Sequence, residues 1–95
     1  MNSIKMTVEN GYIYILKRSN DTYYIGSTKN IKDRINRHKS GRVKSTKNLL
    51  PIKLVFYQKC DTLLKARRIE YKLKKLKSRE IIEKIIKDNI ITMEP

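Results

Sequence analysis

The chain is poor in cysteine and in acidic residues, and it lacks a long apolar run. Cys60 is the only cysteine among 95 residues, so the chain cannot form an internal disulfide or a thiolate metal cluster, and a reducing compartment is expected. No stretch approaches the roughly 20 apolar residues of a membrane span, and the N-terminus lacks the pattern of a signal peptide. These absences predict a soluble intracellular protein, cytoplasmic or nucleoid-associated, with no membrane association.

The shortage of acidic residues leaves the chain strongly basic. Its 23 Lys and Arg outnumber 9 Asp and Glu, which gives a formal net charge of +14. A field of this sign attracts polyanions in a salt-sensitive way, and a small basic domain is typical of nucleic-acid binding. Two other interpretations fit the charge. One is a merely soluble basic protein, and the other is a basic helix on an acidic membrane, although such helices usually pack on a core.

The first half of the chain predicts a hairpin followed by a helix. β-forming residues at 12–16 and 23–26 flank turn residues at 19–22, which is typical of two antiparallel strands. Asn30 is a suitable N-cap for a helix that runs to about Ser40, where the next residue is a glycine that can end it.

The second half predicts one more strand and two more helices. The strand at 52–57 follows a basic loop, a long helix begins after Asp61 or Thr62, and a last helix begins after Ser78. The order β-β-α-β-α-α predicts an α+β domain, a small antiparallel sheet with helices packed on it. We divide the chain into a flexible arm at 1–10, the domain at 11–88 and a tail at 89–95.

Alternation along the hairpin places different residues on its two faces. The simplest pairing buries one face, formed by Ile13, Ile15, Tyr23 and Ile25. Tyr14 and Tyr24 then share the other face.

Glu70 falls on the apolar face of the long predicted helix. That face is formed by Leu63, Ala66, Leu73 and Leu76. A carboxylate there costs several kcal/mol unless it is paired or binds a cation. Glu70 therefore forms an ion pair with Arg67, Lys74 or a strand lysine, or it binds Mg²⁺ or a similar hard cation, which prefers oxygen ligands.

Arg34 and His38 lie four residues apart on one stripe of the first predicted helix. Either can be an ordinary surface residue. Together they combine a guanidinium that binds phosphate oxygens with an imidazole that titrates near neutral pH. Tyr14 and Tyr24 are more often core or sheet-surface aromatics, and a tyrosine is a weak base unless nearby cations lower its pKa. Arg34, His38 and a divalent ion would supply such cations.

These residues stand in a pattern that resembles the GIY-YIG nuclease family. Tyr12-Ile13-Tyr14 and Tyr24-Ile25-Gly26 resemble its two signatures, with Tyr12 in place of the first glycine and Gly11 just before it. Residues 30–38 resemble the helix of the catalytic arginine, residues 66–70 the segment of the metal-binding glutamate, and residues 44–57 the linking segment of short, stand-alone members. The resemblance covers about residues 11–87, and motifs in this order and spacing form a specific signal.

The resemblance implies a three-stranded antiparallel sheet flanked by helices, and an endonuclease with one divalent cation, Mg²⁺ or Mn²⁺. By position, Tyr14 is the expected general base that activates water, and Tyr24 helps to position the phosphate or the water. Members of the family differ over which tyrosine is the base. The resemblance further implies that Arg34 stabilises charge on the phosphate, that His38 tunes a tyrosine, and that Glu70 holds the metal.

The sequence thus predicts a metal-dependent endonuclease that cuts nucleic acid, DNA in preference to RNA, by in-line attack of a tyrosine-activated water. The family implies 5′-phosphate and 3′-hydroxyl products. Ser27 stands where repair nucleases tend to have a lysine, which speaks against an excision-repair role. The alternative is a binding module on the same fold that does not cut, or that cuts only beside a protein partner supplying specificity. The residues predicted to contact nucleic acid are Lys44, Lys47, Lys65, Arg67, Arg68, Lys72, Lys74, Lys75 and Lys77.

Overall fold

The computed structural model describes residues 9–93 and confirms the α+β class and the order of its elements. The strands are β1 (Gly11–Lys17), β2 (Tyr23–Thr28) and β3 (Lys53–Cys60). The helices are α1 (Ile31–Lys39), α2 (Leu63–Leu76) and α3 (Arg79–Asp88), and a short 3-10 turn, η2 (Lys47–Leu49), precedes β3. Within residues 9–93, no helix is long and apolar enough to cross a membrane. The greater part of the predicted arm, residues 1–8, lies outside the described residues.

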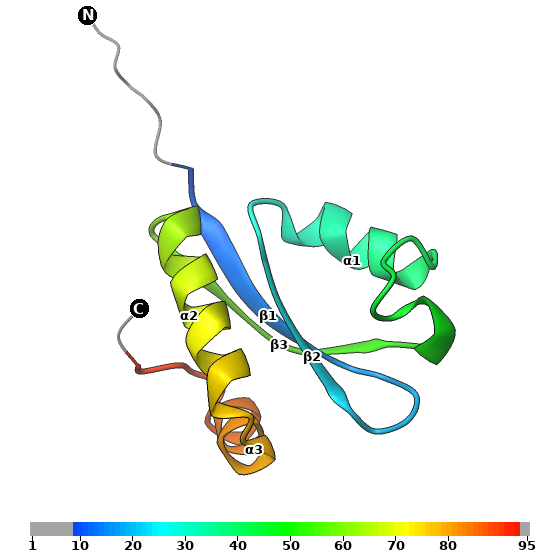
Figure 1. Cartoon of the computed structure of the whole chain (residues 1–95). Helices are drawn as coiled ribbons and strands as arrows, with labels where there is room; N and C mark the ends of the chain where they lie inside the picture. Colours follow the sequence, from blue (N-terminus) through cyan, green and yellow to red (C-terminus); the bar gives the residue numbers. More distant parts are fainter. Residues whose placement is uncertain (1–8, 94–95) are drawn as a thin grey trace, which may run out of the picture.

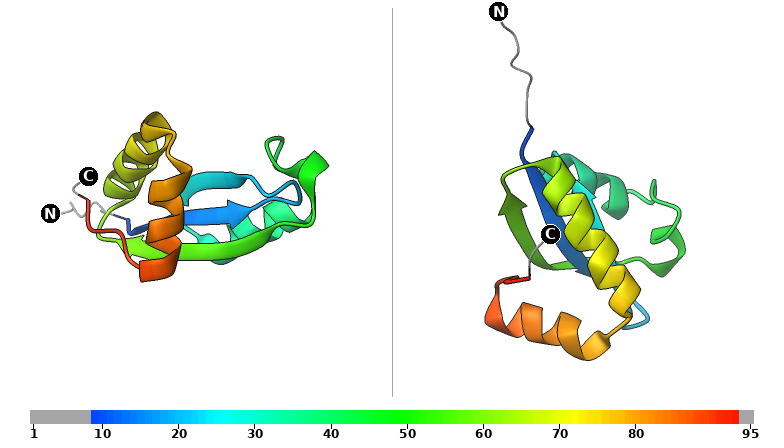
Figure 2. Two further views of the ribbon diagram at one scale, coloured as in Figure 1. Left: turned by 90° about the horizontal axis from the view of Figure 1, so that it is seen from below. Right: turned by 60° about the vertical axis from the view of Figure 1, so that its left-hand side comes forward.

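The sheet has the strand order β2-β1-β3, and both pairings are antiparallel. The central strand β1 is covered on both faces, because α1 lies on one side of the sheet and α2 and α3 lie on the other (Figure 1). Figure 2 shows the same layers from two further directions. A central strand buried on both faces accounts for the unbroken run of apolar and aromatic residues in β1.

Each face of the sheet has its own core. On the side of α2 and α3, Ile13 and Ile15 are fully buried as predicted, and Tyr23 and Ile25 are half-buried. On the side of α1, Tyr14 has an exposed fraction of 0% and shares its face with Tyr24 as predicted, with the two ring centroids 6.2 Å apart. The predicted pairing named only the other face as buried, but α1 and the segment before β3 cover this face too. Tyr14, Leu16, Ile35 and Ile52 form the second core there.

The helix ends follow the predicted capping chemistry. Asn30 accepts a hydrogen bond from the backbone N–H of Asp33, Thr62 from that of Lys65, and Ser78 from that of Ile81. Thr62 rather than Asp61 therefore caps α2. Gly41 follows the end of α1 with a φ of +78°, a left-handed conformation that glycine adopts without strain.

The packing of α2 and of the C-terminal segment differs in part from the prediction. Ala66 and Leu73 are buried with Ile69, which the predicted stripe omitted, while Leu76 is 50% exposed at the end of α2. After α3, Ile91 is buried, and its backbone N–H and C=O both bond to the side-chain amide of Gln58. Part of the predicted tail thus packs on the core, and the division into arm, domain and tail stays a prediction.

The backbone of β1 at Gly11 lies close to α2, and we expect Gly11→Ala to destabilise the fold. A Cβ at this position would lie 2.5 Å from the Cα of Leu63, a backbone atom that cannot move aside without shifting the helix. Overpacking of this kind costs roughly 1–3 kcal/mol. Urea unfolding of Gly11→Ala beside Asn10→Ala, a change at the exposed neighbouring position, measures the cost. Equal midpoints for the two variants would contradict this close contact.

Candidate active site

The five residues predicted to be catalytic come together where β2 lies between α1 and α2. The ring of Tyr14, on β1, lies with its centroid 6.2 Å from that of Tyr24 on β2 and 5.7 Å from that of His38 on α1. The rings of Tyr24 and His38 are 5.0 Å apart. Arg34 on α1 and Glu70 on α2 are close enough to Tyr14 to change its pKa in opposite directions. Four separate elements therefore supply one cluster.

Tyr14 fits into this cluster because its neighbour across the hairpin is a glycine. Gly26 pairs with Tyr14, and a Cβ on Gly26 would lie 2.4 Å from the phenol oxygen. Burial raises the pKa of Tyr14 far above its usual value, the charges of Tyr24 and Glu70 add to this effect, and Arg34 opposes it. Tyr14 is therefore a neutral phenol in the free protein, and its hydroxyl can donate a hydrogen bond.

That hydroxyl bonds to His38, which is itself fully buried. The Oη of Tyr14 lies 2.9 Å from Nε2 of His38, and Nδ1 of His38 lies 2.9 Å from Oγ1 of Thr46. Burial lowers the pKa of His38 to about 4, and the charges of Arg34 and Arg37 add to this effect. The imidazole is thus neutral at physiological pH, with one nitrogen protonated and the other an acceptor.

Thr46 is the residue of this cluster that sequence reasoning missed. It has an exposed fraction of 0%, although it lies in the segment 42–50 that the sequence predicts to be a basic loop. Its hydroxyl is placed to donate to the carbonyl of Val43 at 3.4 Å, which leaves an oxygen lone pair for Nδ1–H of His38. His38 Nε2 then accepts from Tyr14. No local pattern signals this role, because the contact depends on how the loop folds back on α1.

Glu70 lies at the margin of the site with its side chain 21% exposed. Its Oε1 accepts a hydrogen bond from the hydroxyl of Ser27 on β2, and its Oε2 lies 2.6 Å from the ammonium of Lys74. The ion pair that the sequence offered as one reading of Glu70 is therefore present, with Lys74 as the partner. The same ammonium lies 5.8 Å from the centroid of the Tyr24 ring.

The side chains near Glu70 suit a cation that takes few of its ligands from the protein. Among residues 9–93, no three His, Cys, Asp or Glu side chains gather closely enough to form a metal cage. One partly exposed carboxylate, with phosphate and water as further ligands, is an arrangement that Mg²⁺ accepts. The residues present therefore fit a single divalent ion that binds together with a phosphate.

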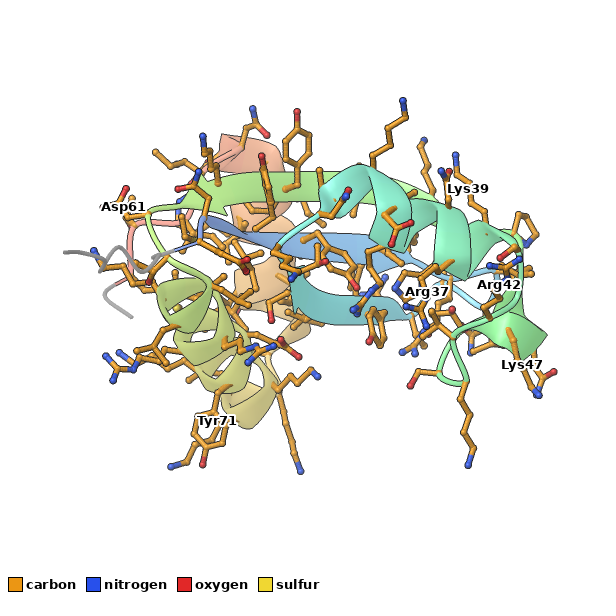
Figure 3. All side chains as sticks on the ribbon, turned by 90° about the horizontal axis from the view of Figure 1, so that it is seen from above. Arg37, Lys39, Arg42, Lys47, Asp61 and Tyr71 are labelled. Atoms are coloured by element: carbon orange, nitrogen blue, oxygen red, sulfur yellow. The ribbon has the colours of Figure 1, made fainter. Side chains whose placement is uncertain are left out.

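The residues predicted to contact nucleic acid are all exposed. Lys44 and Lys47 lie in the segment after α1, and the others lie on α2 or at its C-terminal end. Figure 3 shows Arg37, Arg42 and Lys47 on the α1 side of the molecule. Basic surfaces therefore stand on both sides of the candidate site. Lys65 pairs with Asp61 and Lys74 with Glu70, so these two cations are partly neutralised.

The buried imidazole predicts a pH-dependent stability. Because the pKa of His38 falls from 6.5 to about 4 on folding, the unfolded chain binds more protons between these values. The contribution of neutral His38 to the free energy of unfolding is nearly full above about pH 6.5. It declines as the pH falls toward 4, with a loss of about 2 kcal/mol between pH 7 and pH 5. Urea unfolding of the wild type and of His38→Gln over this pH range measures how much of the pH dependence of the unfolding free energy comes from His38.

His38 is the only histidine, so NMR of its ring nitrogens reads the pKa and the tautomer directly. We expect an Nδ1–H tautomer in the wild type and in Thr46→Ser, and its loss in Thr46→Val, which removes the acceptor. Thr46→Val should also cost about 1–3 kcal/mol, because a buried donor loses its partner. A titration midpoint near 6.5, or an Nε2–H tautomer in the wild type, would contradict the arrangement described above.

Comparison with known proteins places this site in a family. The sequence-family model of the GIY-YIG catalytic domain matches residues 10–85. A UPF0213 protein from Syntrophus aciditrophicus is 39% identical over 80 residues, which cover 82% of this chain and 91% of that protein. A UPF0213 protein from Clostridium perfringens is 34% identical over 80 residues, covering 83% and 86% of the two chains.

A solved structure is similar as well. The solution NMR structure of a UPF0213 protein from Bacillus halodurans matches with a TM-score of 0.54 and 34% identity, covering 82% of this chain and 83% of that one. The family match spans the residues from the start of β1 to α3, including all the side chains of the cluster. The protein therefore belongs to the GIY-YIG catalytic domain family, as a small member similar to the UPF0213 proteins.

Proposed function

We propose that the protein is a metal-dependent endonuclease that hydrolyses phosphodiester bonds in nucleic acid, with DNA preferred over RNA. The observation that carries the proposal is the meeting of Tyr14, His38 and Glu70 between two basic surfaces. The family match supports nuclease chemistry, and the net charge of +14 supports a polyanionic substrate.

In this proposal the phosphate binds beside Arg34, at the mouth of the cluster. Arg34 is a half-buried residue, and its guanidinium stabilises the charge that grows on the phosphate oxygens in the transition state. A divalent cation held by Glu70, Mg²⁺ or Mn²⁺, would neutralise phosphate charge and assist the leaving oxygen. Ser27 positions the Glu70 carboxylate, and a cation held there would replace the ammonium of Lys74 as its charged partner.

Tyr14 serves as the general base through its contact with His38. The raised pKa keeps Tyr14 protonated at neutral pH, so the phenol oxygen can take a proton from water only as its own proton leaves. The lone pair on Nε2 of His38 lies 2.9 Å from the phenol oxygen and receives that proton as Tyr14 takes one from the attacking water. Thr46 keeps the acceptor nitrogen facing Tyr14 in this scheme.

The burial of Tyr14 adds a condition to this role. A base must contact the water that it deprotonates, and Tyr14 exposes none of its surface in the free protein. Its neighbours Tyr24 and Arg34 are half-buried. We propose that substrate binding shifts one of them and admits the water, with Tyr24 then positioning the water or the phosphate.

The burial of Tyr14 also favours a second candidate function. With Tyr14 covered and both carboxylate oxygens of Glu70 bonded to Ser27 and Lys74, the free domain presents a closed site. A module with such a site binds nucleic acid through its basic surfaces and cuts it only beside a protein partner, or not at all.

Glu70→Gln separates the two candidates. We expect metal-dependent cutting to fall by roughly a hundredfold or more, because removing one group that stabilises transition-state charge costs about 3 kcal/mol. The assay uses labelled single strand, duplex, flap, four-way junction and RNA with Mg²⁺ or Mn²⁺, beside EDTA. Glu83→Gln is the matched control, since Glu83 is an exposed carboxylate on α3 with its own partner, Arg79.

Full metal-dependent cutting by Glu70→Gln would show that the metal assignment is wrong. Binding of every substrate without cutting, by wild type and variant alike, would favour the binding module.

Tyr14→Phe and Tyr24→Phe each remove one hydroxyl and keep the ring. If Tyr14 is the base, Tyr14→Phe should lower kcat by roughly a hundredfold or more, whereas Tyr24→Phe should have a smaller effect. Single-turnover rates measured across pH make the comparison, and circular dichroism checks the fold of each variant. The opposite order of effects would move the role of base to Tyr24.

A further inference from the structure

The outward face of α2 carries an exposed aromatic ring that the mechanism does not use. Tyr71 is 66% exposed, and it lies on the opposite side of α2 from the buried residues Ala66, Ile69 and Leu73. Figure 3 shows its side chain projecting away from the sheet. The fold therefore gains little from this ring, and what sets it apart from a single exposed residue is the group of cations around it.

The ring stands within a group of cations. Arg67, Arg68, Lys72 and Lys75 line a shallow open groove together with Tyr71. The ammonium of Lys75 lies 5.9 Å from the centroid of the Tyr71 ring. Arg67, Tyr71 and Lys75 follow one another at four-residue steps, so the ring is the centre of a row along the helix. We refer to these five residues as the α2 face.

This combination matches the chemistry of an unpaired nucleic-acid strand. A row of cations follows the phosphates, and an aromatic ring among them stacks on a base, which contributes to affinity without reading sequence. In a duplex the faces of the bases are covered by their neighbours, so a protruding tyrosine finds nothing to stack on except at an end. The cations alone would bind both forms, whereas Tyr71 distinguishes the unpaired one.

The α2 face also lies next to the candidate site along the chain. Tyr71 directly follows Glu70, and adjacent residues of a helix are separated by a rise of about 1.5 Å and by just over a quarter turn. A strand on the α2 face can therefore continue around the helix toward Glu70.

We propose that the α2 face binds an unpaired segment of nucleic acid next to the bond that is cut, with Tyr71 stacked on a base. The proposal rests on the proposed function in that both need a nucleic-acid substrate, and it specifies a substrate with single-stranded character. Association of two copies through this face is disfavoured, because it would bring like charges together.

Binding measured in EDTA tests the proposal without any need for cleavage. The probes are a fluorescent oligothymidine of roughly 12 nucleotides and a blunt-ended duplex of similar phosphate number, at one salt concentration. We expect Tyr71→Ala to weaken binding of the single strand by about tenfold and to leave duplex binding unchanged, while Tyr71→Phe keeps both affinities. An unchanged melting temperature of each variant confirms that the fold is intact.

Tyr57→Ala is the matched control. Tyr57 is 55% exposed on β3, which forms the sheet edge opposite β2, so this variant loses an exposed ring away from the α2 face. We expect it to bind both probes like the wild type. Equal losses on the two probes for Tyr71→Ala, or no loss on either, would overturn the proposal. So would a change in sedimentation with no change in binding, since the ring would then serve contact between copies.

These outcomes are distinct from failure of the proposed function. A protein that cuts no substrate but shows the Tyr71-dependent preference for single strands would refute the nuclease proposal and support the α2 face. If the protein cuts, and its Tyr71→Ala variant binds and cuts single strands like the wild type, the nuclease proposal is supported and the proposal for the α2 face is refuted.

Discussion

The hydrogen bonds that join Tyr14, His38 and Thr46 are the contact on which the rest of the site depends. Each of these side chains is fully buried, and each brings a polar atom into a core where water cannot satisfy it. The bonds link β1 to α1 and α1 to the loop after it. Because every member needs the next one, the sheet, the helix and the loop can adopt only the arrangement that satisfies them together.

Electrostatics determines what the cluster can do. Burial keeps Tyr14 and His38 neutral, so the centre of the site carries little charge of its own. The charged groups stand around it, with Arg34 on α1 and the pair of Glu70 and Lys74 on α2. In the proposed function, the charged groups attract a phosphate to the edge of the site, and the neutral pair of Tyr14 and His38 supplies a base for the attacking water.

Much of the fold followed from short-range patterns. The caps Asn30, Thr62 and Ser78 each bond to a backbone N–H three residues later, so neighbouring residues determine where each helix begins. Alternation along the hairpin placed Tyr14 and Tyr24 on one face correctly, but alternation says which side a residue points to and not what covers that side, so it did not predict the full burial of Tyr14. Leu76 was assigned to the core by spacing alone, yet α2 ends there and leaves it exposed.

The sequence by itself determined the elements, their order and the identity of most residues in the cluster, because periodicity, capping and motif spacing operate over a few neighbouring positions. Only the tertiary structure decided which atoms meet. Tyr14 and His38 are 24 positions apart, and Ser27 and Glu70 are 43 apart. Contacts at such separations depend on how the helices pack on the sheet. The same packing buries Thr46 and turns Tyr71 outward, and no pattern within either segment contains that information.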